Sequence, residues 1–342
     1  MKFGTFHLME RPFSKGEVQV IHEHLEQMKL ADRTGFDAVW LTEHHFSSVP
    51  YVPDVMGEYG LSTSPFALAC AVAQVTERVR IGTAVKVLPL EHPIRTAEDI
   101  TFADILSNGR IDVGVGTGYR KYEFEGLGVA VEEKVERFKE ALEIMVGAWT
   151  TDEFSYEGKF WQVPRLTLVP RPIQKPHPPV WIATRLGTRE IIDFAVSGGY
   201  RLLSAWAPPE ELRVASDLIR EVQAEQGRGG EGFDFPCIRH VFVAESDADA
   251  KRLGTEYIEY YMKSTALFRP IGEHEREQMV FGGVETCIEK LRRLRAEGGV
   301  NYVLCWMNFG GMPHDMVSRS MQLFADAVMP ALRDDVASSA AE

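Results

Sequence analysis

Residues 34–41, Thr34-Gly35-Phe36-Asp37-Ala38-Val39-Trp40-Leu41, carry the pattern that decides the fold: a helical stretch ends at a glycine and a short apolar run follows. A glycine just past a helix ends it in the left-handed conformation and frees the chain to enter a strand. The same order of helix, glycine and apolar run recurs before residues 111–115, 200–203 and 302–304. Such repetition predicts βαβ units and a parallel sheet.

Further apolar runs bring the number of expected strands to eight: 3–6, 79–88, 179–183 and 240–244. Eight βα units close more naturally into a (β/α)8 TIM barrel than into an open doubly wound sheet. We therefore expect an α/β fold with one barrel domain, carrying insertions, over residues 1–332. Residues 333–342, rich in alanine and serine, are expected to form a flexible tail.

Insertions account for the length of 342 residues, because a typical barrel has about 250. Residues 154–161 show the alternation and glycine turn of a hairpin, and the proline-rich stretch 170–179 leads directly into a strand. Long irregular segments at 46–65, 119–131 and 264–283 are typical of lids or binding loops.

The composition is that of a compact globular protein, with 45% hydrophobic and 25% charged residues and a net charge of −13. An acidic chain without a basic patch disfavours nucleic acid as a partner. The four cysteines lack the short spacings of zinc or redox motifs. The N-terminus lacks a signal sequence and no apolar run reaches the ~20 residues of a membrane span, so we expect no membrane association and a cytoplasmic location.

The second expected strand ends in Glu43-His44-His45, at the C-terminal rim where barrel enzymes keep their active sites. A histidine there can transfer protons near neutral pH. A hydrogen-bonded core pair explains the same residues equally well, and a metal site is disfavoured because no third ligand has a suitable spacing. If the strand continues through both histidines, only one of them can point inward.

The glycine-rich run 110–119 invites a dinucleotide interpretation. That fingerprint requires glycine or alanine at its third position and then a helix, whereas Tyr119 stands there and residues 120–128 are expected to form a loop. A Rossmann site is therefore disfavoured. The glycines either let a strand end approach a flat ligand or relieve crowding inside the barrel.

Residues 183–190 join the strand 179–183 to the next helix. The hydroxyls of Thr184 and Thr188, the guanidinium of Arg185 and the free amides of a helix N-terminus would together bind a phosphate. An ordinary N-cap with a solvated arginine is the alternative.

Taken in order, these motifs resemble those of the bacterial luciferase-like flavin monooxygenases, most closely the alkanal monooxygenase α-subunit type. The resemblance covers most of the chain and is carried by 1–4, 35–37, 40–46, 82–128, 180–190 and 328–330. It implies a TIM barrel that binds reduced FMN from a separate reductase, forms a C4a-hydroperoxyflavin with O₂, and oxygenates a small carbonyl or hydrophobic substrate.

The resemblance also implies roles for single residues. His44 matches the catalytic acid or base, and His45 its supporting neighbour. Thr83-Ala84 falls where the family has a non-prolyl cis peptide under the flavin ring, and Tyr119 where a loop touches the flavin. The phosphate site is expected at Ala183, Thr184, Arg185, Leu186, Gly187 and Thr188.

Two departures from the luciferase pattern concern neighbouring positions. Thr117 stands where luciferase has an arginine for the flavin phosphate, so Arg185 is expected to supply that charge. Gly116 stands where luciferase has a reactive cysteine, which is expected to enlarge the space above the flavin. Light emission is not implied.

A water-excluding pocket suits this chemistry. Its expected walls are Phe46, Trp206, Phe242, Trp306, Met307 and Phe309, with 264–283 as the lid. The resemblance further implies a homodimer. Two other functions stay open: a coenzyme F420-dependent reductase or dehydrogenase, and a non-catalytic flavin-binding partner subunit.

Overall fold

A closed parallel barrel forms the centre of the computed structural model, which describes residues 1–47, 57–58, 61–184, 187–229, 232–264 and 271–333. Eight of the described strands build it: β1 (Lys2–His7), β3 (Ala38–Leu41), β5 (Arg80–Thr83), β7 (Ile111–Gly116), β10 (Val180–Thr184), β11 (Arg201–Ser204), β12 (Pro236–Val243) and β14 (Tyr302–Trp306). Their order is β10-β11-β12-β14-β1-β3-β5-β7, and pairing of β7 with β10 closes the ring. The predicted TIM barrel is confirmed.

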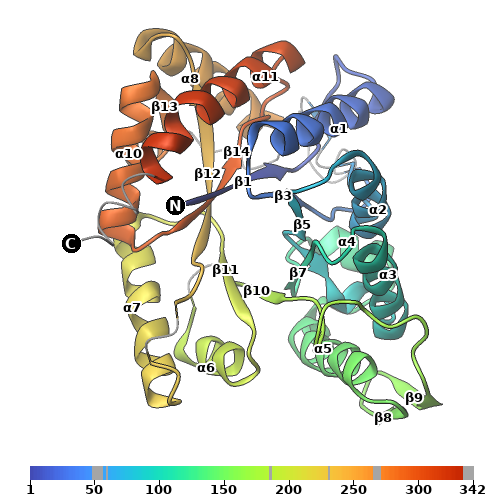
Figure 1. The fold of residues 1–342 in the computed structure, drawn as a ribbon. Coiled ribbons are helices and arrows are strands. Elements are labelled where there is room, and N and C mark those ends of the chain that lie inside the picture. Colours follow the sequence, from blue (N-terminus) through green and yellow to red (C-terminus); the bar gives the residue numbers. More distant parts are fainter. Residues whose placement is uncertain (48–56, 59–60, 185–186, 230–231, 265–270, 334–342) are drawn as a thin grey trace.

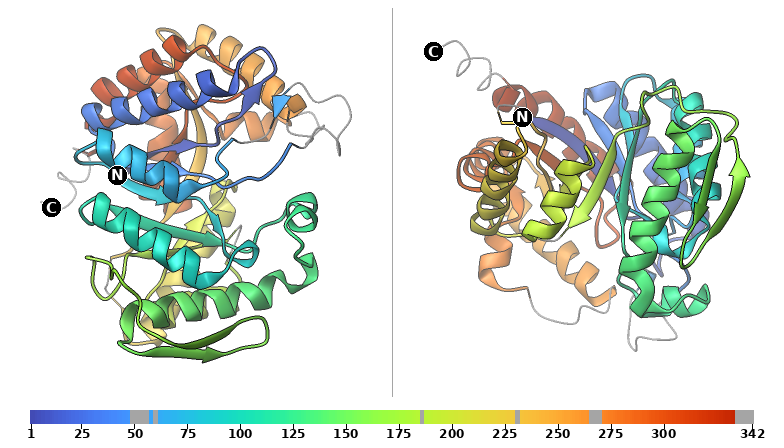
Figure 2. Two further views of the ribbon diagram at one scale, coloured as in Figure 1. Left: turned by 90° about the vertical axis from the view of Figure 1, so that its right-hand side faces the viewer. Right: turned by 90° about the horizontal axis from the view of Figure 1, so that it is seen from below.

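Helices surround the barrel on its outside (Figures 1 and 2). The main ones are α1 (Glu17–Thr34), α2 (Pro65–Val75), α3 (Pro93–Leu106), α5 (Lys134–Thr150), α6 (Arg189–Ser197), α7 (Pro209–Glu225), α10 (Val284–Gly298) and α11 (His314–Leu323). The four glycines predicted to lead from helix into strand all have positive φ: Gly35, Gly109, Gly199 and Gly299. Local glycine conformation therefore sets the alternation that the sequence showed.

The remaining elements complete the structure. They are the helices α4 (Lys121–Gly126), α8 (Asp247–Ser264) and α9 (Glu273–Glu277), the strands β2 (Arg11–Pro12), β4 (Gly57–Glu58), β6 (Lys86–Val87), β8 (Phe154–Glu157), β9 (Gln162–Leu166) and β13 (Val280–Gly282), and single turns at Leu88–Leu90, Val131–Glu133 and Phe324–Val328. The predicted hairpin is present as the antiparallel pair β8–β9.

Five expectations need correction. The stretch 120–128, expected as a loop, contains α4, and the expected lid 264–283 contains α9 and β13 among its described residues. The run 79–88 is two strands rather than one, and the cis peptide between them joins Ala84 to Val85, one residue later than expected. Strand β12 begins at Pro236, ahead of the apolar run expected to form it.

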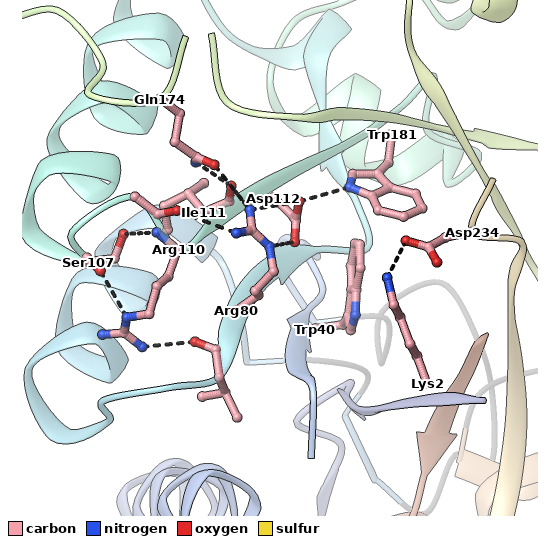
Figure 3. A network of polar contacts seen from close by, with 12 residues as sticks. Lys2, Trp40, Arg80, Ser107, Arg110, Ile111, Asp112, Gln174, Trp181 and Asp234 are labelled. Atoms are coloured by element: carbon pink, nitrogen blue, oxygen red, sulfur yellow. Dashed lines mark hydrogen bonds and ion pairs between the residues drawn. The ribbon is translucent and has the colours of Figure 1, made fainter. Parts of the chain in front are cut away.

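Trp40 lies in the interior of the barrel, and its indole nitrogen donates to the Tyr302 hydroxyl at 2.8 Å. Glycine is required around it, since a Cβ at Gly4 or Gly82 would lie 2.9 or 2.4 Å from the indole ring. Trp181 meets the same ring edge-on (Figure 3). The rings of Trp40, Trp181 and Tyr302 are all buried, so side chains fill this part of the barrel interior.

A polar network beside these rings ties neighbouring strands together (Figure 3). The carboxylate of Asp112 on β7 accepts from Arg80 on β5 at 2.5 and 3.1 Å and from the Trp181 indole on β10 at 3.1 Å. Because the carboxylate is buried, these charged and indole donors are what make its burial tolerable.

The C-terminal part of the described chain contacts the segment that leads into β3. Arg333 donates to the carboxylate of Asp37 at 2.8 Å, and residues 334–342 of the expected tail lie outside the described residues. The division into one domain and a tail stays a prediction. No helix within the described residues is long and apolar enough to cross a membrane.

Candidate functional site

The ring order brings most of the predicted site residues to one rim. Strands β3, β5, β7 and β10 are consecutive neighbours, and their C-terminal ends carry the histidine pair, the cis peptide, Thr117 with Tyr119, and Ala183 with Thr184. Parallel strands place their carboxyl ends at the same edge, so these segments surround one half of the barrel mouth.

His44 is held by a carboxylate on α4, the helix that follows β7, two strands along the ring from β3. Its Nδ1 donates to Oε1 of Glu123 on α4 at 3.0 Å, and the backbone N–H of His45 donates to the same oxygen at 3.1 Å. Burial lowers the pKa of His44, and the nearby Glu123 only partly opposes this. His44 is therefore a neutral imidazole at neutral pH, with its proton on Nδ1 and its Nε2 in the basic form.

His45 belongs to a second buried network. Its Nε2 donates to Oε1 of Glu43 at 3.1 Å, and the same oxygen accepts from Lys86 at 2.6 Å. Burial alone would raise the pKa of Glu43, but the bonds from His45, Lys86 and the Val87 amide together hold it below its usual value. Strand β3 ends at Leu41, so the two histidines follow the strand and point to different carboxylates.

Tyr119 lies at the open side of the site. Its ring meets that of His44 edge-on with centroids 6.1 Å apart, and it is largely exposed. The guanidinium of Arg120 lies 5.3 Å from the Tyr119 ring centroid. An exposed aromatic ring beside a buried imidazole is a suitable contact for a flat ligand.

The glycines of β7 are explained by crowding inside the barrel. A Cβ at Gly114 would lie 1.7 Å from the carbonyl oxygen of Thr83, and one at Gly116 would lie 2.6 Å from Val85. The hydroxyl of Thr83 is also committed, since it donates to the Gly114 carbonyl at 2.7 Å. Val85 occupies the space that was expected to open above a flavin. Thr117 is half-buried at the end of the strand.

The N-terminus of α6 carries the predicted phosphate site. Thr188 is its N-cap, with the Ile191 amide donating to its hydroxyl at 3.5 Å, and Ala183 and Thr184 are half-buried at the end of β10. Gly187 allows close packing, since a Cβ there would lie 2.7 Å from Ile192. Arg185 and Leu186 lie outside the described residues.

The donors at this terminus fit the phosphate of a flavin mononucleotide. The hydroxyls of Thr184 and Thr188 and the first amides of a helix are phosphate-binding groups, and the helix dipole adds positive potential. Arg189 is not an available cation, because it is paired with Glu221 and Glu225.

The residues predicted to form the pocket walls differ in exposure. Phe242, Trp306, Met307 and Phe309 are buried, whereas Phe46 is exposed and packs beside Gly126 of α4. Trp206 is half-buried under the guanidinium of Arg239 at 5.7 Å.

The sequence predicts no role for two residues of these networks. Glu123 stands in a charged segment expected to be a loop, and Lys86 lies in a run expected to be one strand. No local pattern distinguishes them from solvated charges, because both depend on contacts with residues more than 40 positions away.

Comparison with known proteins gives a consistent family. The model described as luciferase-like monooxygenase matches residues 1–302. The oxygenase component of flavin-dependent trigonelline monooxygenase from Acinetobacter baylyi is 27% identical, over 98% of this chain and 96% of that protein. The alkanal monooxygenase alpha chain of the Kryptophanaron alfredi symbiont is 23% identical, over 98% and 99%.

Solved structures agree with the fold. The monooxygenase RslO1 from Streptomyces bottropensis superposes with a TM-score of 0.87 at 26% identity, covering 97% of this chain and 99% of that one. The oxygenating constituent of 3,6-diketocamphane monooxygenase from Pseudomonas putida, in complex with FMN, gives 0.83 at 19%, covering 96% and 98%. An F420-dependent secondary alcohol dehydrogenase gives 0.73 at 18%, covering 97% and 98%.

Proposed function

Since the chain belongs to the luciferase-like monooxygenase family, we propose that it is the oxygenase component of a two-component system. It takes reduced FMN from a separate flavin reductase, uses O₂, and oxygenates a small carbonyl or hydrophobic molecule. The "oxygenase component" in the name of its trigonelline relative supports the need for a reductase partner.

The observation that carries this proposal is the bond from His44 Nδ1 to Glu123, 3.0 Å long and buried at the barrel rim. It fixes an imidazole whose other nitrogen is basic, which is the form a general base needs at neutral pH. Reduced FMN supplies the electrons that activate O₂. The chain supplies His44 to move a proton beside the flavin and His45, anchored by Glu43, to support it.

FMN is proposed to span the rim from β10 to β5. Its phosphate would bind Thr184, Thr188 and the first amides of α6, with Arg185 as the expected cation. Its ring system would then extend towards Thr117, Tyr119 and Ala84. The FMN complex of the diketocamphane enzyme, which shares this fold, supports the choice of cofactor.

An F420-dependent hydride transfer is the second candidate, favoured by the structural likeness to the F420-dependent dehydrogenase. Anaerobic titration of the full chain with reduced FMN and with reduced F420 separates the two. We expect reduced FMN to bind at least about tenfold more tightly, a difference of about 1.4 kcal/mol. Tighter F420 binding would sink the monooxygenase proposal.

A non-catalytic flavin-binding subunit is the third candidate. His44→Ala decides this one, because it removes the base and leaves the phosphate site intact. Turnover of reduced FMN and O₂ into oxygenated product should fall by about 10²-fold or more. An unchanged rate would favour the non-catalytic alternative.

A homodimer is proposed through α2 and α3, which pack together (Figure 1). Exposed apolar side chains lie along them: Val75, Phe102, Ile105 and Leu106. Phe102→Asp should convert a dimer into a monomer in light scattering, whereas Phe13→Asp, at another exposed phenylalanine, should not. A monomeric parent protein would contradict the proposal. The cytoplasmic location stays a prediction.

A further inference from the structure

His240 lies in an aromatic wall on the half of the barrel opposite the proposed flavin site. The wall is defined here as Phe6, His240, Tyr261, Trp306 and Phe309. The imidazole stacks on the Trp306 indole with ring centroids 4.3 Å apart and an interplanar angle of 24°. Phe309 and Tyr261 approach it with centroids at 5.1 and 5.9 Å, and Phe6 contacts Trp306 at 5.1 Å.

The strand order places this wall next to the histidine pair. His240 is in register with Trp306, the last residue of β14, so it stands at the C-terminal rim. Strands β12, β14 and β1 are neighbours, and the next strand is β3, which leads to His44. The wall therefore lies beside the strand that leads to the proposed base.

Both ring nitrogens of His240 are buried and lack a hydrogen-bond partner. Other buried histidines are paired: His7 contacts Thr5 and His24 at 2.8 and 3.0 Å, and His24 also contacts Asn308 at 3.3 Å. Within the described part of the chain, His240 is the only histidine with both nitrogens buried and unpaired. Buried polar groups in proteins are nearly always paired, so this exception requires an explanation.

The surroundings define what could pair with it. Burial lowers the pKa of His240 to about 3, so the imidazole is neutral and offers one N–H donor and one acceptor. The neighbouring Arg239 is committed to the carbonyls of Ala207 and Ile238 at 2.6 and 2.9 Å. A wall of aromatic carbon with a neutral donor favours an uncharged, flat ligand with a single acceptor oxygen.

We propose that His240 donates a hydrogen bond to the carbonyl oxygen of the substrate, and that the substrate is a flat, uncharged ketone or aldehyde whose rings pack on the aromatic wall. His240 is then a positioning residue that sets substrate specificity. The assignment rests on the proposed oxygenase function for its relation to His44, but the binding site itself does not depend on that function.

The test compares two probes that differ only in the carbonyl, 1-indanone and indane. Calorimetry on the full chain, without oxygen or reduced flavin, measures both dissociation constants. We expect the parent protein to prefer 1-indanone by about fivefold to tenfold, the worth of one hydrogen bond. His240→Phe keeps the ring stack and should bring the ratio to about one while leaving indane binding unchanged.

A matched control is available in His177→Phe, because His177 also stacks on an indole, that of Trp149, with centroids 5.9 Å apart. It should leave the preference for 1-indanone intact. His240→Phe should be at least as stable to heat as the parent protein, since it removes an unpaired buried polar group. Loss of the preference therefore cannot be attributed to unfolding.

The proposal is overturned if His240→Phe keeps the preference, if the parent protein shows none, or if neither probe binds. Failure of the oxygenase proposal gives a different result. In that case reduced FMN does not bind, while 1-indanone is still preferred and the preference is still lost in His240→Phe.

Discussion

The His44 imidazole and the Glu123 carboxylate, 79 positions apart in the chain, are joined by a buried 3.0 Å hydrogen bond across the barrel rim. Because a carboxylate only accepts, the bond puts the imidazole proton on Nδ1. The same oxygen accepts the His45 amide at 3.1 Å, so one carboxylate fixes both the tautomer of the side chain and the backbone that carries it. Partners of this kind orient a functional histidine.

Glu123→Gln should lower the pKa of His44, because Glu123 is the main group that opposes the effect of burial. The pKa is measured by NMR titration of the histidine ring nitrogens. Turnover should fall by about 10-fold to 100-fold, as for other residues that orient a functional group. Glu125→Gln is the matched control, since Glu125 lies on the same helix with an exposed side chain. Equal titration curves for both variants would mean that Glu123 does not tune His44.

Thr188→Ala should weaken binding of reduced FMN, because the hydroxyl caps α6 and is one of the groups proposed to bind the phosphate. We expect a dissociation constant about threefold to tenfold higher, equivalent to the ~1 kcal/mol of a typical N-cap or neutral hydrogen bond. Thr188→Ser retains the hydroxyl and should bind like the parent protein. If Thr188→Ala binds reduced FMN normally, the phosphate lies elsewhere.

Acid should destabilise the fold through its buried neutral histidines. Burial lowers the pKa of His7 and of His240 from 6.5 to about 3, so below 6.5 the unfolded chain binds protons that the folded chain does not. Stability is therefore full above the unfolded pKa and falls as the pH drops towards about 3. Each histidine should cost about 2 kcal/mol between neutral pH and about pH 5.

Urea unfolding at several pH values measures the free energy of unfolding and checks this. In His240→Phe, the loss of stability at acid pH should be smaller by the amount that one buried histidine contributes. His22→Gln, at an exposed histidine, should leave the dependence unchanged. A pH dependence that is the same in His240→Phe and the parent protein would contradict the burial argument.

Gly114→Ala should destabilise the barrel strongly, because its Cβ would lie 1.7 Å from the backbone oxygen of Thr83. A backbone atom cannot turn aside as a side chain can, so we expect a loss of about 3 kcal/mol or failure to fold. Thermal unfolding measures the loss. Gly232→Ala, where nothing lies within 4 Å of the added Cβ, is the control and should unfold near the parent temperature.

The sequence predicted the barrel because the alternation of helices and strands depends on short stretches of adjacent residues. Gly35, Gly109, Gly199 and Gly299 each end a helical segment and adopt positive φ, and these are properties of a few adjacent residues. The placement of the histidine pair at a strand end follows from the same local pattern. The prediction was wrong at 120–128, because the helix there is too short to give a periodic pattern of apolar residues.

By itself the sequence determined the alternation of strands and helices and the residues that reach the barrel rim, because both depend on short-range conformation. Only the tertiary structure decided which of these residues pair. Closure of the ring brings Glu123 to His44 and Lys86 to Glu43, and leaves His240 without a partner among aromatic rings. Hydrogen-bond pairing and burial depend on contacts between residues that are distant in the chain, and only the folded structure brings those residues together.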